Sequence, residues 1–350
     1  MHSHLARVLS VAILLASPLQ GQVEQRTLRG TTVAVYNLVG LLRAVPATGD
    51  AVTVEITRRG ADGNQLKIET GPVRGRETLR MVYPSDRIVY SAARHRGQRT
   101  TLNVREDGTF SDGDSNERGR DRVEIRGSGS GLDAHADLVV GIPRGQRIEL
   151  FLAVGRVEMA NVEGDILVDV GAAEVDVAGA KGNLVFDTGS GHVSLRDVIG
   201  NVDLDTGSGG LTVDRLKGDV LNIDSGSGGI RGADIEVREL RADVGSGGLR
   251  LSAVKAARIV AETGSGGVDL GLLTNVELLD VETGSGGATI RAPASLSAEI
   301  EAETGSGGFS TDFEIVTRRF SRNHVVGRIG DGKGRVRLEA GSGSIRLLKN

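Results

Sequence analysis

Thr206-Gly207-Ser208-Gly209-Gly210 is one copy of a short motif that recurs toward the C-terminus of the chain. Successive copies of its Gly-Ser-Gly core start 18, 19, 19, 19, 20 and 21 residues apart, and the last interval of 36 is close to two periods. A fixed period near 20 residues with one punctuating motif is the signature of a repeat architecture. The first glycines of the cores are predicted to form corners between stacked coils: Gly189, Gly207, Gly226, Gly245, Gly264, Gly284, Gly305 and Gly341.

Apolar residues stand at fixed positions around each motif. Leu211 and Val213 follow the first glycine by four and six residues, Val268 and Leu270 repeat this pattern, and Leu204 stands three residues before it. Spacing by two residues between turn signals indicates strands. Two short strands per coil, joined by glycine corners, predict an all-β parallel β-solenoid, a single-stranded β-helix with coils of roughly 18–21 residues. At roughly 4.8 Å per coil, about ten coils give a rod on the order of 45 Å long.

The N-terminus is predicted to be a signal peptide covering residues 1–21. Arg7 precedes the apolar run 8–16, and the small residue Gly21 follows Pro18 near the expected cleavage point. The run is too short to span a bilayer. We therefore expect an exported protein, in the periplasm, the outer envelope or the extracellular space, with no transmembrane helix in the mature chain.

The mature chain divides into two continuous parts by its pattern. Residues 22–147 are an N-terminal β region with short alternating runs, interrupted by a polar insertion at 91–131. Residues 148–350 carry the regular repeat and are predicted to form the solenoid. Arginines flank the insertion and make it a candidate binding loop for an acidic glycan or lipid headgroup, or else a solvated loop: Arg94, Arg96, Arg99, Arg118, Arg120 and Arg122.

The glycine motif itself is interpreted as structural. A corner between stacked coils needs a backbone that only glycine adopts easily, and leaves no room for a Cβ. No Lys-Ser/Thr pair follows the glycines and no helix is expected after them, so the motif does not fit a phosphate-binding loop.

An acid stands two residues before each first glycine. In stacked coils these carboxylates would lie about 4.8 Å apart along one face, and adjacent carboxylates would repel by roughly 1 kcal/mol in water. Two interpretations remain open: a solvated face that discourages aggregation, or a stripe that gathers cations such as Ca²⁺ weakly. The Gly-Gly-x-Gly-x-Asp repeat of calcium-binding β-rolls is absent, which argues against tight sites. This acidic column comprises Asp187, Asp205, Asp224, Asp243, Glu262, Glu282, Glu303 and Glu339.

Other chemistries find less support. A hydroxyl residue such as Thr206 usually follows each acid, as in the threonine ladders of ice-binding solenoids, but it precedes a corner and the series breaks at Val244. Asp107 to Asp114 lacks the closing Glu of an EF-hand loop. A net charge of −4 gives no basic field for nucleic acid.

A polysaccharide-active β-helix enzyme is the alternative from a different class. Such an enzyme needs carboxylates or a base in a groove, with aromatic residues to hold the sugar. The chain has no Trp, 3 Tyr and no Cys. Beyond the insertion its histidines, His135, His192 and His324, are scattered without a companion motif. We therefore expect no catalytic residues and no cofactor.

The sequence resembles the bacterial putative-adhesin family of β-strand-repeat proteins, a family of unknown function. The likeness rests on residues 137–145 (Asp-Leu-Val-Val-Gly-Ile-Pro-Arg-Gly), the coil starts at Gly164 and Gly200, the repeated Thr-Gly-Ser-Gly-Gly, and the ending at 330–345. It covers residues 30–350, and the insertion at 91–131 is its main departure. The resemblance implies an exported, envelope-associated, non-enzymatic β-solenoid with a binding, adhesion-like or structural role. Its partner would be an envelope or extracellular protein or glycan; a cation-binding surface protein is a second alternative.

Overall fold

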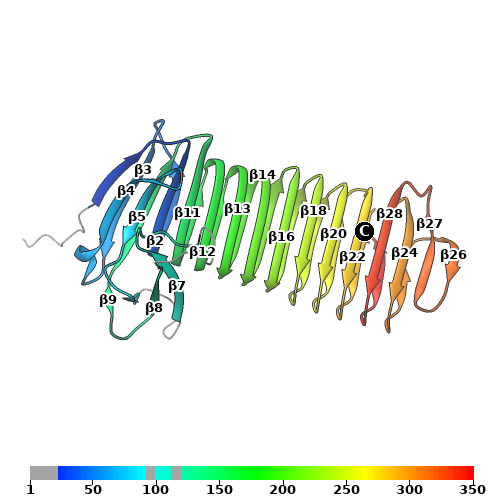
Figure 1. Cartoon of the computed structure of the whole chain (residues 1–350). Helices are drawn as coiled ribbons and strands as arrows, with labels where there is room; N and C mark the ends of the chain where they lie inside the picture. Colours follow the sequence, from blue (N-terminus) through cyan, green and yellow to red (C-terminus); the bar gives the residue numbers. More distant parts are fainter. Residues whose placement is uncertain (1–22, 92–98, 112–119) are drawn as a thin grey trace, which may run out of the picture.

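The computed structural model describes residues 23–91, 99–111 and 120–350, and these fold into strands and loops with one 3₁₀ turn at Gly63–Gln65. Figure 1 shows a broad N-terminal part followed by a long rod of stacked strands. The all-β prediction is confirmed, and the long sheet is mostly parallel, as a solenoid requires. The predicted signal peptide, residues 1–21, lies outside the described residues.

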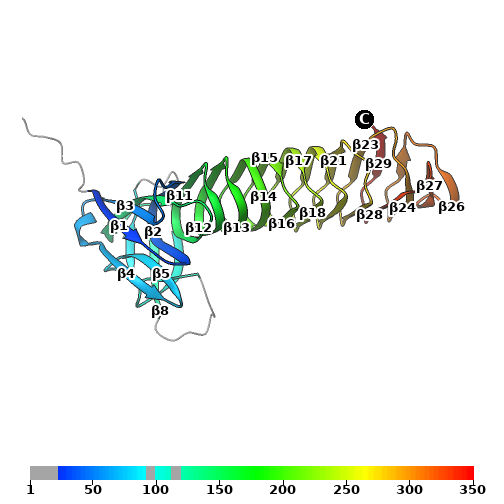
Figure 2. The same cartoon turned by 90° about the horizontal axis from the view of Figure 1, so that it is seen from above.

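The rod consists of two strand layers joined by corners, which Figure 2 shows from above. Adjacent strands are paired so that chemically similar residues lie opposite one another. Asp187 of β13 lies opposite Asp205 of β14, and Leu211 of β15 lies opposite Ile230 of β17. Long strands bend from one layer into the other: β2 (Thr32–Pro46), β11 (Gln146–Ala160), β12 (Glu163–Ala178) and β14 (Val193–Ser208). The remaining first-layer strands are β13 (Lys181–Ser190), β16 (Val220–Ser227), β18 (Glu239–Val244), β20 (Arg258–Thr263), β22 (Leu278–Thr283), β24 (Ala298–Thr304) and β28 (Gly334–Ala340). The remaining second-layer strands are β15 (Leu211–Lys217), β17 (Ile230–Glu236), β19 (Leu249–Lys255), β21 (Val268–Leu272), β23 (Ala288–Ala292), β25 (Phe309–Thr311) and β29 (Ile345–Lys349).

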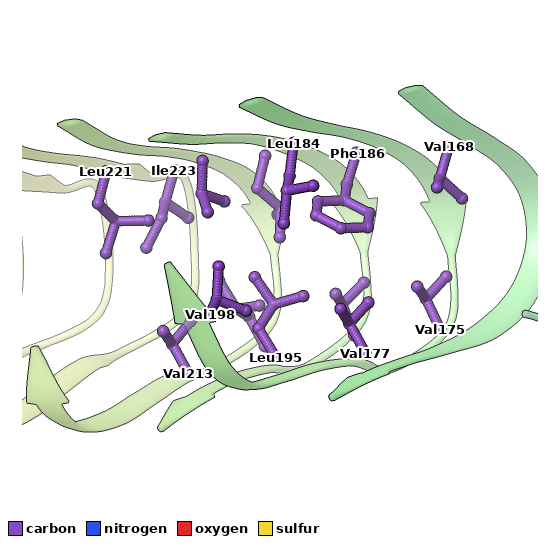
Figure 3. Close-up of a cluster of buried hydrophobic side chains, with 14 of the residues drawn as sticks. Val168, Val175, Val177, Leu184, Phe186, Leu195, Val198, Val213, Leu221 and Ile223 are labelled. Carbon is purple, nitrogen blue, oxygen red and sulfur yellow. The ribbon is translucent and has the colours of Figure 1, made fainter. Parts of the chain in front are cut away.

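A narrow aliphatic core fills the space between the layers. Alternate side chains of each strand point inward, so that Leu184 and Phe186 of one layer meet Leu195 and Val198 of the other (Figure 3). Each of these side chains is at most 1% exposed. Burial of apolar surface stabilises the fold by about 25 cal/mol per Å². Because one face of every strand is committed to the core, only the outer face is left for function.

The N-terminal end broadens because each layer gains strands of its own. The first coil is β2, which pairs in parallel with β11. The first half of β2 pairs with β5 (Arg76–Val82), which in turn pairs with β4 (Lys67–Val73). The second half pairs with β10 (His135–Ile142), which is followed in the sheet by β3 (Val52–Arg59) and then β1 (Val23–Leu28). Tyr36 and Phe151 stack face to face in the core here, with ring centroids 4.3 Å apart.

The polar insertion contributes to a separate four-stranded sheet. Its strands are β6 (Arg87–Val89), β7 (Arg99–Arg105), β8 (Arg120–Arg126) and β9 (Leu132–Asp133). Arg94, Arg96 and Arg118 of the proposed binding loop lie outside the described residues, and the side chain of Arg120 is not described. Arg99 forms an ion pair with Glu124, whereas Arg122 is exposed.

The C-terminal end departs from sequential stacking. The last interval of 36 residues, although close to two periods, does not form two stacked coils, because within it the chain turns back in an antiparallel hairpin of β26 (Val316–Phe320) and β27 (His324–Ile329). At this turn the N–H of Ser321 donates to the carbonyl of His324, 2.9 Å away. Strand β28 then inserts between β22 and β24, and β29 inserts between β23 and β25.

Candidate functional surfaces

The acidic column lies on the outer face of the first layer, with its members in register on adjacent strands. Its spatial order differs from its order in the sequence, because Glu339 lies between Glu282 and Glu303. Asp169 of β12 lies opposite Asp187 and extends the column by one coil. Asp169 was not among the residues predicted for the column, although it stands two residues before Gly171 as the pattern requires.

Most of the column has little cationic compensation. Seven of its eight members are exposed, and Glu339 is half-buried. Glu339 accepts from Arg337 at 2.8 Å. In the described part of the chain, no Lys or Arg forms an ion pair with Asp205, Asp224 or Asp243. Asp203 stands two residues before Asp205 on the same face and adds negative charge, whereas Asp280, at the equivalent position before Glu282, lies 3.7 Å from Arg337.

The column's charges affect one another. Partial burial, and then the neighbouring Asp205, raise the pKa of Asp187 above its ordinary value. The pKa of Asp224 is raised by desolvation and by Asp205 and Asp243 on the adjacent coils. Desolvation, followed by Asp243 and Glu282, raises the pKa of Glu262. A surface with this property favours any ligand that brings positive charge.

The hydroxyl residues beside the acids face inward. Thr188, Thr206 and Thr283 are each 1% exposed. The Thr283 hydroxyl donates to the carbonyl of Gly286, 2.8 Å away, and so braces the corner. A threonine ladder for ice binding would have to be exposed, so that interpretation is wrong for this column.

The corner glycines stack over one another as a second column. A Cβ on Gly226 would lie 2.7 Å from the carbonyl oxygen of Gly207, closer than real Cβ contacts. In three coils the second glycine of the core has a left-handed φ, +129° at Gly191, +142° at Gly209 and +137° at Gly228, and the later coils do not share it. The predicted corner glycines are thus required by close approach of the neighbouring coil, and in those three coils the glycine two residues later is also required by its φ.

Two hollows lie apart from the acidic column. A groove of about 360 Å³ is lined by glycines of the second layer together with Arg231, Arg250 and Asp269. A pocket of about 570 Å³ lies at the broad end, with a floor that includes Leu38 and Val104 and a rim of mixed charge. Neither hollow was predicted from the sequence: the groove repeats along successive coils at positions 229–231, 248–250 and 267–269, and the pocket joins segments that are far apart in the chain.

The histidines do not converge. His135 packs edge-on against Tyr90 at the broad end, with ring centroids 5.0 Å apart. His192 contacts the hydroxyl of Thr212 on the second layer, and His324 lies 3.4 Å from Glu301 at the far tip. Among the described residues, no three His, Asp or Glu side chains are grouped so as to hold a metal ion.

The structure also contains, where it is described, no helix of the length and apolar character that crossing a membrane would take.

Fold and surfaces together define an elongated β-solenoid with a charged outer face. The chain belongs to the Toastrack DUF4097 family, whose model matches residues 88–348. No curated protein matches the chain. A solved structure described as a putative cell adhesion protein from Clostridium sporogenes is 12% identical, and the match covers 95% of this chain and 100% of that one. Its TM-score of 0.21 is too low to transfer fold or function.

Proposed function

We propose that the protein is an exported, non-enzymatic binding protein of the cell envelope, and that the acidic column is its main contact surface. The partner is an envelope or extracellular protein or glycan that presents positive charge. In this proposal each coil, of roughly 18–21 residues as the sequence pattern gives it, contributes one carboxylate to a continuous surface.

One observation supports this proposal above the others. Asp205, Asp224 and Asp243 lie on successive strands, are exposed, and have no basic partner among the described residues. Elsewhere on the same rod, exposed acids are neutralised across coils, as Asp197 is by Arg215 at 2.6 Å and Asp219 by Arg238 at 2.8 Å. The three aspartates of the column lack such partners and lie in register on successive strands, so their charges add along one face. An extended partner with regularly spaced cations would match its coil-to-coil spacing of about 4.8 Å.

Weak cation binding is the second candidate, favoured by the raised pKa values of Asp224 and Glu262. Oxygen ligands from adjacent coils suit Ca²⁺, which accepts carboxylates in flexible geometry. A calcium titration at low ionic strength tests it. Cation binding predicts a rise in Tm that is lost in the variant Asp205→Asn/Asp224→Asn/Asp243→Asn, and an unchanged Tm would remove this candidate.

The binding proposal is tested with isolated envelopes of the source cell. Labelled chain beginning at residue 23 is added to intact, protease-treated and glycan-stripped envelopes. The column variant Asp205→Asn/Asp224→Asn/Asp243→Asn should lose at least tenfold in affinity. A matched control, Asp214→Asn/Asp234→Asn/Glu277→Gln, removes the same charge elsewhere and should bind as the wild type does.

Two results would contradict the proposal. One is equal envelope binding by the column variant and the wild type. The other is turnover of a glycan by the wild type that disappears in the column variant, which would indicate a polysaccharide-active enzyme instead.

A further inference from the structure

Strand β26 forms the free edge of the first layer at the far tip of the rod (Figure 1). Within the described residues it pairs with β27 alone, and β27 in turn pairs with β24. All five residues of β26 are exposed. Its outer edge therefore presents backbone N–H and C=O groups that no strand satisfies.

Phe320 makes this edge unusual. It is 76% exposed, more than any other large apolar residue described, and Val316 at the other end of β26 is 64% exposed. Opposite residues of an antiparallel pair project to the same face. Phe320 lies opposite Val325, which is 3% exposed, so the ring projects on the core side of the layer, beyond the point where the core ends.

The tip is also basic. Arg318 forms an ion pair with Glu299 at 3.2 Å. Arg319 and the turn residue Arg322 are exposed and have no acidic partner in the described part of the chain. The edge therefore combines unpaired backbone, an exposed aromatic ring and two uncompensated guanidinium groups.

We propose that β26 is a docking edge that receives an extended acidic segment of a partner polypeptide as an additional strand. The added strand would pair with the backbone of β26, cover Phe320 with an apolar side chain on the core side, and place carboxylates beside Arg319 and Arg322. Main-chain pairing supplies affinity in this mode of recognition, and side-chain contacts supply specificity. The site lies two strands beyond β24, which carries Glu303, the last member of the acidic column, and it attracts the opposite charge.

Protection of the edge against aggregation explains only part of this arrangement. Charged residues and the irregular register between Thr317 and Arg319 are ordinary protective features. An exposed aromatic ring on the core side works against this protection, because an added strand would bury the ring and be stabilised by doing so. Pairing with a second copy is disfavoured, since it would bring the arginines of two tips together.

The probe is a blocked nine-residue peptide of alternating valine and glutamate, titrated against the chain from residue 23. Its first control is the same peptide with lysine in place of glutamate. Its second is the acidic peptide N-methylated through its central five residues, which keeps the charges but cannot pair as a strand. We expect the acidic peptide to bind and both controls to bind at least tenfold more weakly.

Two tip variants test the residues separately. Phe320→Thr and the double variant Arg319→Glu/Arg322→Glu should each weaken the acidic peptide at least tenfold. The matched reversal Arg258→Glu/Arg346→Glu, at exposed arginines elsewhere, should remain within twofold of the wild type. The column variant Asp205→Asn/Asp224→Asn/Asp243→Asn should keep peptide binding, so the two proposals fail separately.

Several results would overturn the proposal. Equal binding of the N-methylated peptide would exclude strand addition, and equal binding by the tip variants would exclude this edge. Binding to vesicles of phosphatidylglycerol and phosphatidylcholine that needs Phe320, without peptide binding, would assign the tip to lipid. A dimer in sedimentation that the tip variants dissociate would assign the edge to a second copy.

Discussion

Glu339, close to the C-terminus, lies directly opposite Glu282 on the neighbouring parallel strand. The strand that carries it, β28, also pairs with β24, so the end of the chain fills the step between two coils that are consecutive in sequence. The last coils are thus held together by a segment that is synthesised after both of them. The inserted coil continues the acidic column and the core without interruption.

The inserted strand should couple the two coils that flank it. Leu338 of β28 is 1% exposed, and Leu338→Ala should cost about 2–5 kcal/mol through lost burial and the cavity left behind. In a repeat array each coil contacts only its neighbours. Hydrogen exchange should therefore accelerate in both β22 and β24, while β16 keeps its protection. Acceleration confined to β28 itself would contradict the coupling.

Neighbouring glycines of one corner should respond differently to alanine. Gly228 has φ +137° and its Cβ would overlap the carbonyl of Gly209, whereas a Cβ on Gly229 meets nothing closer than 3.9 Å. Gly228→Ala should destabilise the solenoid by about 1–3 kcal/mol or more. Gly229→Ala should change little. Urea melts of the two variants compare them, and an equal loss in both would show that the corner geometry is different.

The buried hydroxyls offer a second matched pair. The Thr263 hydroxyl donates to the carbonyl of Gly266 at 2.6 Å, whereas the Thr206 hydroxyl is buried without a hydrogen-bond partner among the described residues. Thr263→Val should cost about 1 kcal/mol or more, because it leaves a carbonyl at the corner without its donor. Thr206→Val should be neutral or stabilising. Thermal melts decide this, and a clear loss of Tm in Thr206→Val would contradict the account.

Much of this fold is readable from residue pattern alone. Aligning the copies on Gly207 and its equivalents predicts the strands, the buried positions and the acidic column, because each coil meets the same packing constraints. The pattern does not order the coils, since Glu339 has the same neighbours in sequence whether its coil is added last or inserted. It also does not predict that Thr206 faces inward or that the left-handed backbone falls at Gly209, because both depend on how the chain bends between layers.

Acidification should relieve the acidic column. Asp187, Asp224 and Glu262 have folded-state pKa values above the ordinary values of 3.8 for Asp and 4.5 for Glu. In the pH range between each ordinary pKa and the raised one, the folded state therefore binds more protons than the unfolded state. Their destabilising contribution is full above the raised pKa values and disappears as the pH falls through them toward the ordinary values.

A variant separates this effect from the rest of the protein. Asp187→Asn/Asp224→Asn/Glu262→Gln should have a higher Tm than the wild type at pH 7.5 and low salt, because adjacent repulsion of roughly 1 kcal/mol before screening is removed. The difference should shrink at about pH 4 and in high salt, where screening is strong. A lower Tm for the variant at pH 7.5 would show that these carboxylates stabilise the fold.

The affinity of the chain for the envelope fraction it binds, measured over a range of salt concentrations, tests the central claim most directly. If the acidic column is the contact surface, the wild-type affinity falls steeply as salt rises. The variant Asp205→Asn/Asp224→Asn/Asp243→Asn then binds at least tenfold more weakly at low salt, with a flatter salt dependence, while the control Asp214→Asn/Asp234→Asn/Glu277→Gln follows the wild type. Equal affinities and equal salt dependence for all three proteins would contradict the claim.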